Sequence, residues 1–252
     1  MKASWLIAPM LALALSGATD RAARAEADQS SQDLCAVPDD LMDERSPLLF
    51  ASAVLKHDRK LVIVAVGSAS TLGVGNTSPA AAWPARLRAA LAKELPEREV
   101  TVHTVAARGM TAENAVRSLD KQVLPLKPSL VVWQAGTTEA ARRVDPEEFG
   151  RWLQDGVDTL LAARIDVVLM DMQFSPRFIA AINYQPYLDA IVQVEQHRDL
   201  VRFQRFEVMR HWSETEQLAQ GLPPDKPAAL ADRVHDCIGK LLGRMIGEAL
   251  RQ

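Results

Sequence analysis

The sequence predicts an α/β protein, a three-layer domain in which a parallel sheet of about five strands has helices on both faces. Short apolar runs without polar alternation indicate strands that are buried on both faces. These runs alternate along the chain with segments of helical periodicity, which is typical of a parallel sheet. Several runs end abruptly in glycine or small polar residues. The carboxyl ends of such strands border the active crevice in open α/β sheets.

The first apolar run, residues 61–66, is expected to form a buried strand that ends at Gly67. A short helix is expected before it, at residues 47–56. A longer helix is expected at residues 79–95, because Ser78 can serve as N-cap and a proline occupies the first helical position. The other expected strands are residues 99–105, 130–133, 166–170 and 200–203. The other expected helices are residues 112–121, 146–163, 187–197, 206–220 and 237–250.

The N-terminus predicts export. Lys2 precedes an apolar run at residues 5–15, and Ala-Arg-Ala follows at residues 23–25, so residues 1–25 are expected to be a cleaved signal peptide. The run is shorter than the roughly 20 residues of a membrane span, although an uncleaved anchor is the alternative. We therefore expect a periplasmic or secreted protein without stable membrane insertion. Residues 26–45 are expected to form an extended arm, and residues 46–252 one domain.

The two cysteines and the charge balance narrow the function classes. Cys35 and Cys237 are expected to form a disulfide in an oxidising compartment; two free thiols in a reducing cell are the alternative. No Cys-x-x-Cys occurs and the five histidines are scattered, so no metal site is predicted. The net charge of −3 and the lack of a basic cluster argue against a nucleic-acid partner. The charged run at residues 193–205 is expected to be solvated.

Candidate catalytic residues follow the strand ends and recur near the C-terminus. Small or polar residues lie at 67–71, 107–112 and 134–139, and Asp232 precedes His235 by three positions. A carboxylate at that spacing can orient an imidazole, which can then act as general base for a hydroxyl nucleophile. The residues alone also allow simpler roles. Asp232 can be a helix N-cap, and serines after a strand can bond to nearby backbone groups.

The order of these blocks resembles the SGNH (GDSL-type) hydrolase superfamily over residues 60–250. The segments 67–87, 133–137 and 169–176 are similar to an exported bacterial branch whose first block reads Gly-Ser-Ser-Ser-Thr; here it reads Gly-Ser-Ala-Ser-Thr at residues 67–71. The superfamily comprises esterases, lipases, thioesterases, carbohydrate acetylesterases and acyltransferases. The resemblance implies its flavodoxin-like three-layer fold, a serine nucleophile and no cofactor.

The resemblance also assigns roles to individual residues. It implies that Asp232 and His235 complete the catalytic triad. It places the nucleophile position on Ala69, the oxyanion-hole glycine of the second block on Ala112, and the oxyanion-hole asparagine of the third block on Thr138. The oxyanion donors are then the backbone N–H groups near Ala69 and Ala112, helped by the Thr138 hydroxyl.

Alanine carries no nucleophile, so three interpretations of this block stay open. Ser68 or Ser70, one residue on either side of Ala69, takes over as nucleophile; the chain is a pseudoenzyme that keeps the cleft for binding a ligand or partner; or this copy was altered at position 69. Under the first interpretation, we expect an exported serine esterase or acyltransferase that acts on a small acyl ester, such as one on an envelope glycan or lipid. That interpretation requires Ser68 Oγ or Ser70 Oγ within about 4 Å of a His235 ring nitrogen.

Overall fold

A computed structural model describes residues 34–42 and 46–252 of the chain. The contacts divide the chain after Ala36, so the folded unit described below begins at Val37. The predicted signal peptide, residues 1–25, lies outside the described residues, as does most of the predicted arm at residues 26–45. Within the described ranges, no helix combines the length and apolar character needed to cross a membrane.

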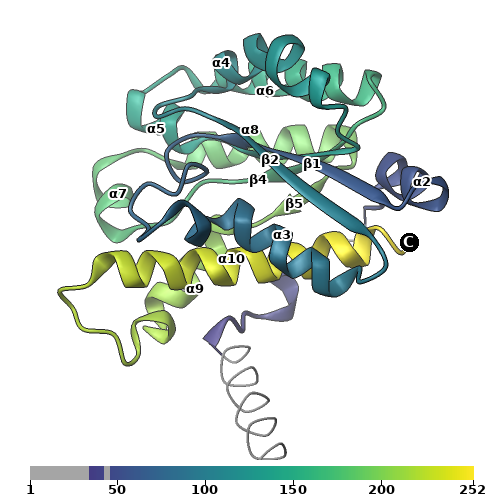
Figure 1. The fold of residues 1–252 in the computed structure, drawn as a ribbon. Coiled ribbons are helices and arrows are strands. Elements are labelled where there is room, and N and C mark those ends of the chain that lie inside the picture. Colours follow the sequence, from purple (N-terminus) through teal and green to yellow (C-terminus); the bar gives the residue numbers. More distant parts are fainter. Residues whose placement is uncertain (1–33, 43–45) are drawn as a thin grey trace, which may run out of the picture. The chain divides into compact units, whose positions relative to one another are not determined.

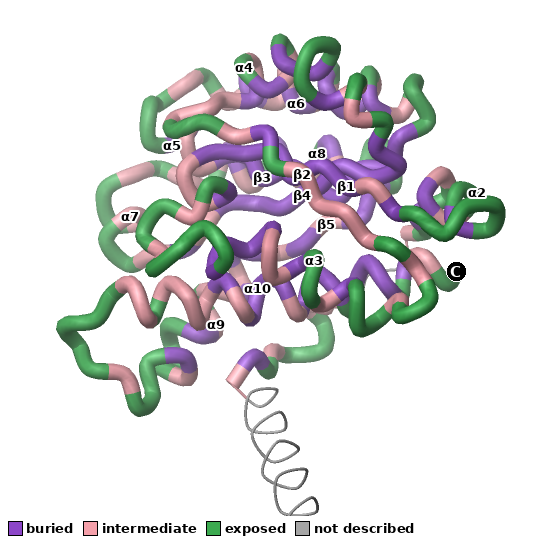
Figure 2. Tube along the Cα trace, viewed as in Figure 1, coloured by how far each residue is buried: buried purple, intermediate pink, exposed green. Residues whose placement is uncertain are grey.

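Five parallel strands form one sheet in the order β2–β1–β3–β4–β5 (Figure 1). They are β1 (Lys60–Gly67), β2 (Glu99–Ala106), β3 (Leu130–Gln134), β4 (Asp166–Met170) and β5 (Val201–Phe203). Every residue of β3 and β4 is buried, whereas β2 lies at an edge and is mostly half-buried. Figure 2 shows the central strands buried between two layers of helices. The predicted α/β class and its five-stranded parallel sheet are confirmed.

Helices cover both faces of this sheet. Figure 1 places α4 and α6 on one face, where α8 packs against α6, and places α3 and α10 side by side on the other. The α-helices are α2 (Leu49–His57), α3 (Trp83–Glu94), α4 (Ala112–Ser118), α5 (Thr137–Arg142), α6 (Pro146–Ala162), α7 (Pro176–Ala181), α8 (Gln185–Arg198), α9 (Arg205–Glu214) and α10 (Pro227–Ala249). Short 3-10 or π turns lie at Asp39–Leu41, Pro79–Ala81, Leu119–Val123, Leu124–Leu126 and Gln217–Ala219.

The structure corrects several expected helix boundaries. The last helix was predicted at residues 237–250 but begins at Pro227, because a proline in the first turn and the alanines that follow favour an earlier start. Asp232 and His235 therefore lie inside α10 rather than before it. The predicted helix 79–95 is a 3-10 turn followed by α3, and Ser78 makes no side-chain cap. The helices α5 and α7 were not predicted.

A stripe of small residues on α10 sets the position of His235. Gly239 and Gly243 follow it at intervals of four residues, so all three lie on one face of the helix. A Cβ atom at Gly239 would lie 2.4 Å from Arg86 Cβ, and one at Gly243 would lie 2.6 Å from Ala90 Cβ. The glycines thus let α10 approach α3 closely. One turn earlier, the same packing brings His235 against the start of α3.

Candidate active site

Ser70 is the serine that meets His235. It lies in the turn after β1, where the Leu72 N–H bonds to the Ser68 carbonyl and the Val74 N–H bonds to the Ala69 carbonyl. Ser70 Oγ lies 3.5 Å from His235 Nε2. This distance meets the requirement stated for a substitute nucleophile. Ser68 is buried, and its backbone N–H donates to Gln134 Oε1 at 3.4 Å.

The hydrogen bonds of His235 define its tautomer. Its Nδ1 accepts the backbone N–H of Trp83 at 3.0 Å. A backbone N–H can only donate, so Nδ1 carries no hydrogen and the neutral ring carries its hydrogen on Nε2. The Nε2–H group therefore donates toward Ser70 Oγ. Burial, together with the positive charge of Arg205, lowers the pKa of His235 to about 3, against a smaller opposing effect of Asp232.

The Asp232 carboxylate accepts hydrogen bonds from the loop after β1 instead of orienting the His235 imidazole. Its Oδ1 accepts the Asn76 side-chain amide and the Thr77 backbone N–H, each at 2.9 Å, and its Oδ2 accepts the Thr77 hydroxyl. Burial raises the pKa of Asp232, but the bonds from Thr77 and Asn76 outweigh it and hold the pKa below its usual value. The triad-like hydrogen bond expected between Asp232 and His235 is replaced, because the Trp83 N–H already occupies Nδ1.

The expected oxyanion donors are engaged differently from the prediction. The Ala112 N–H donates to Glu139 Oε1 at 2.6 Å, and the Gly136 N–H donates to Glu139 Oε2 at 3.1 Å. A carboxylate of the protein thus already fills the place expected for an oxyanion at Ala112. Burial raises the pKa of Glu139, and these backbone bonds oppose the increase. Thr138 is half-buried.

Arg205 is a site residue that the sequence analysis missed. It begins α9, is 1% exposed, and donates from Nη2 to Ser70 Oγ at 2.8 Å. Residues 193–205 were expected to be solvated, but Arg205 is buried and the Arg202 side chain is only 17% exposed. A signal was available, because Arg205 lies two residues after the last residue of β5, at the sheet edge where the crevice lies.

Asp171 is a buried carboxylate whose negative charge acts to raise the pKa of Arg205. Its Oδ2 accepts Arg202 Nη1 at 3.1 Å, and its Oδ1 accepts the Phe206 N–H at 2.8 Å. Burial raises the pKa of Asp171 to about 6, although Arg202, the Phe206 N–H and Arg205 all act to lower it. Both carboxylate oxygens are therefore used by partners other than Arg205.

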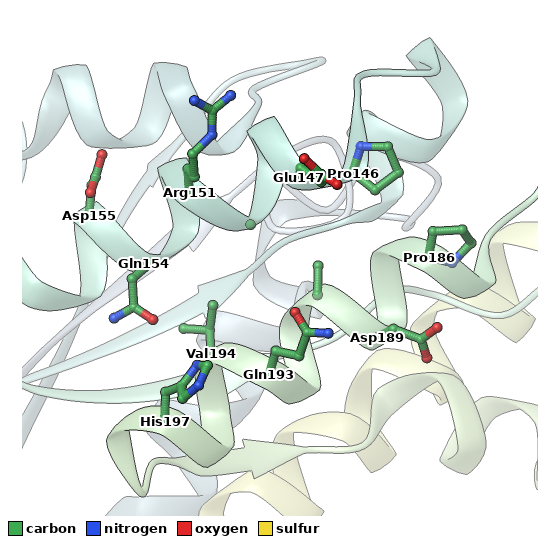
Figure 3. Close-up of a pocket in the computed structure, with 12 residues that line it drawn as sticks. Pro146, Glu147, Arg151, Gln154, Asp155, Pro186, Asp189, Gln193, Val194 and His197 are labelled. Carbon is green, nitrogen blue, oxygen red and sulfur yellow. The ribbon is translucent and has the colours of Figure 1, made fainter.

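Two surface hollows lie away from Ser70 and His235. One is a groove of about 490 Å³ between α6 and α8, lined by residues of both helices that include Gln154, Gln193 and His197 (Figure 3). The other, of about 560 Å³, is bordered by Arg143, Asp145 and Tyr187. Within the described residues, no three His, Cys, Asp or Glu side chains gather as a metal site would require.

The two cysteines form a disulfide. Neither Cys35 nor Cys237 is a free thiol, and both are disulfide-bonded. The sequence contains only these two cysteines, so the predicted pairing is confirmed.

Solved structures with this fold are known hydrolases. The chain is similar to an acetyl-xylooligosaccharide esterase from Geobacillus, with a TM-score of 0.60 and 16% identity over 74% of this chain and 94% of that one. It is similar to a lipase/acylhydrolase from Enterococcus faecalis, with a TM-score of 0.56 and 18% identity over 75% and 96%. AlinE4, a SGNH-hydrolase family esterase, gives a TM-score of 0.53 and 22% identity over 64% and 84%. No curated protein sequence matches.

The family match over residues 34–252, together with these structural likenesses, supports the SGNH-type hydrolase superfamily. The model of the non-GDSL lipase-like family matches residues 34–252, so the chain belongs to that family. At these identities the solved structures establish the fold alone.

Proposed function

We propose that this protein uses the hydrolase fold to bind a ligand and has lost serine-triad catalysis. The observation that carries the proposal is the Trp83 backbone N–H, which donates to His235 Nδ1 at 3.0 Å. A general base must offer a lone pair at Nε2 to the serine hydroxyl, and in a triad Nδ1–H points to a carboxylate. In this protein Nδ1 accepts a hydrogen bond instead, and Nε2 carries the hydrogen.

Changing the tautomer would be unfavourable. Moving the hydrogen to Nδ1 would set it against the Trp83 N–H and leave a buried donor unsatisfied, at a cost of about 1–3 kcal/mol. With a pKa near 3, His235 is also a weak base. Asp232 cannot compensate from its present position, because its oxygens are bonded to Asn76 and Thr77.

The surroundings of Ala112 support the same proposal. An oxyanion approaching this N–H would have to displace or face the Glu139 carboxylate. Loss of a single oxyanion donor typically costs about 2.7–4 kcal/mol of transition-state stabilisation. A negative charge at that point adds repulsion to the loss. With Ala69 at the nucleophile position, three parts of the catalytic machinery are altered together.

Ester hydrolysis or acyl transfer by Ser70 is the second candidate function. The 3.5 Å distance between Ser70 Oγ and His235 Nε2 favours it, because ordinary thermal motion can close that gap to a hydrogen bond. Its substrate class would be a small acyl ester, such as one on an envelope glycan or lipid. Two structurally similar proteins fit this class: the acetyl-xylooligosaccharide esterase, and a two-domain esterase active on acetylated mannans.

Active-site labelling separates the two functions. The purified chain is treated with a fluorophosphonate probe and assayed with p-nitrophenyl acetate, alongside Ser70→Ala, Ser68→Ala and His235→Asn. We expect no labelled serine and no turnover above that of Ser70→Ala. Labelling of Ser70, with turnover that depends on both Ser70 and His235, would reverse the order of the two proposals. Ser68→Ala is the matched control for the loss of a neighbouring hydroxyl.

Export is part of the proposal. The disulfide between Cys35 and Cys237 fits an oxidising compartment such as the periplasm or the exterior. Expression of the full chain in a Gram-negative host, followed by N-terminal sequencing of the periplasmic extract, tests this. We expect the mature protein to begin after Ala25. Full-length chain retained in the cytoplasm would contradict it.

A further inference from the structure

The strand β2 leaves one edge of the sheet open. It is the terminal strand in the order β2–β1–β3–β4–β5, so it pairs with β1 on one side only. The Glu99 N–H donates to the carbonyl of Arg59, just before β1, and the Ala107 N–H donates to the carbonyl of Gly67, at the end of β1. Successive residues of a strand direct their backbone groups to alternate sides. The odd-numbered residues of β2 therefore face β1, and the even-numbered residues face out of the sheet.

The outward backbone groups of β2 have no protein partner. They are the N–H and C=O groups of Val100, Val102 and Thr104, and within the described residues no hydrogen bond reaches them. Water can satisfy these groups in a monomer. A second strand laid along the edge can satisfy them as well, because a row of unpaired N–H and C=O groups is a template for strand pairing.

The strand β2 lacks the features that normally protect an edge. Edge strands usually avoid other chains by being short, by carrying Lys or Pro, or by forming a β-bulge. β2 spans eight residues and keeps a regular register with β1 through all of them. Its sequence is EVTVHTVA, with one charged residue, Glu99, at the first position. The opposite edge strand, β5, has only three residues and is protected by its length. Figure 2 draws most of β2 as half-buried or exposed.

The outward residues are complementary to a second copy of the same strand. In an antiparallel pair, two residues that lie opposite each other exchange both of their N–H···O=C bonds. With Val102 on a two-fold axis, Val102 pairs with Val102 of the partner subunit, and Val100 pairs with Thr104 of the partner subunit in both directions. All three outward residues find partners at once. Their β-branched side chains then lie beside one another, which stabilises strand pairing.

The charges favour this antiparallel direction. In the Val102-centred register, Glu99 lies opposite Val105 of the partner subunit, at the far end of the pair from the second Glu99. A parallel pair in register would place the two Glu99 carboxylates side by side, and like charges at such positions are destabilising. The two-fold axis would stand perpendicular to the sheet. The helix layers of the two copies would therefore continue on matching faces.

We propose that two copies of this chain pair through the outward edge of β2, antiparallel and centred on Val102, so that their sheets join into one. Three outward N–H groups from each copy, those of Val100, Val102 and Thr104, give six hydrogen bonds between the strands. A closed two-fold dimer is the commonest form of self-assembly. The interface uses neither Ser70 nor His235, so the inference is independent of the proposed function.

Sedimentation equilibrium of the purified chain at increasing protein concentration tests the inference. We expect a monomer–dimer equilibrium. Val102→Pro should weaken dimerisation by about tenfold or more, because proline removes the N–H group from both bonds at the axis. The pairing with β1 should survive, since the Val102 N–H points away from β1 and an edge strand tolerates proline at such positions. Val102→Thr is the matched control. It keeps the N–H group and the β-branched shape, so it should leave dimerisation within about twofold.

Hydrogen exchange of the backbone amides locates the interface without any substitution. In the dimer the N–H groups of Val100, Val102 and Thr104 should exchange slowly, and they should exchange fast once the protein is diluted to the monomer. The N–H groups of Thr101 and His103, which face β1, should stay protected at both concentrations.

A monomer at every concentration would overturn the inference, as would a dimer that Val102→Pro leaves unchanged. Fast exchange at Val100, Val102 and Thr104 in a dimer would place the interface elsewhere and refute the inference too. Circular dichroism shows whether Val102→Pro folds. If it does not, the exchange rates of the unmodified chain at the two concentrations decide the question.

Discussion

The charge state of His235 gives the sharpest prediction. Its pKa is about 3 in the folded chain and 6.5 ordinarily, so the folded protein binds fewer protons than the unfolded chain between these values. His235 therefore contributes stability that is complete above about pH 6.5 and is lost as the pH falls toward 3. Because the folded group stays neutral over this range, lowering the pH from 7 to 5 should remove about 2 kcal/mol.

Urea unfolding at pH 7 and pH 5 measures this loss, with His235→Asn as the comparison. The asparagine oxygen can take the place of Nδ1 and still accept the Trp83 N–H, but it does not titrate. The pKa values of Asp171 and Glu139 are raised in both proteins, so their contributions cancel in the difference. The unmodified chain should lose about 2 kcal/mol more than the variant between the two pH values.

Nitrogen chemical shifts of the His235 ring test the same argument directly. We expect a protonated Nε2 and an unprotonated Nδ1 from pH 7 down to pH 5. A hydrogen on Nδ1, or titration of the ring near pH 6.5, would refute the reasoning. Equal pH dependence of the unfolding free energy in the two proteins would refute it as well.

Three further predictions concern the packing that holds the site. Glu139→Gln should lower the unfolding free energy by about 1–3 kcal/mol in urea, because its amide must face a buried backbone N–H. Glu113→Gln is the control: this α4 side chain is 39% exposed and pairs with Arg117 at the surface, so the change should be about 0.5 kcal/mol or less. Gly156→Ala should cost about 1–3 kcal/mol, since its Cβ would lie 2.4 Å from the β3 tryptophan ring. In the same helix, a Cβ atom at Gly150 would lie 3.6 Å from its nearest neighbour, so Gly150→Ala should instead raise the thermal midpoint. If Gly150→Ala were the less stable of the two variants, that result would contradict this packing. Cys237→Ser should cost about 2–5 kcal/mol in urea, and a reductant should destabilise the unmodified chain equally but leave the variant unchanged.

The amino-acid sequence determined the fold through local signals. Apolar runs such as residues 61–66 and 166–170 indicate strands buried on both faces, and the strands β1 and β4 follow them closely. The cysteine pair was also predictable, since only one pairing exists. The helix boundaries were less predictable from the sequence. The start of α10 depends on Pro227 and the alanines after it, which lie ahead of the predicted start at residue 237.

The roles of the site residues depended on contacts between segments far apart in the chain. Asp-x-x-His spacing allows a triad, but the loop at Thr77 takes the Asp232 carboxylate. Glu139 accepts the backbone N–H of Ala112, which lies 27 positions away in the chain. Nothing near Ala112 in the sequence reveals this contact. Arg205 is buried because it follows β5 at the edge of the sheet where its side chain donates to Ser70 Oγ.

Tertiary packing alone decided whether His235 donates or accepts at Nε2. The sequence supplied the imidazole and a hydroxyl one residue from the expected position. The close approach of α10 to α3, made possible by Gly239, then set the Trp83 N–H against Nδ1. A tautomer depends on the partner of each ring nitrogen, and here that partner lies 152 positions away. No local pattern carries this information. Only the packed structure therefore shows whether His235 Nε2 donates a hydrogen bond to Ser70 or can accept its proton.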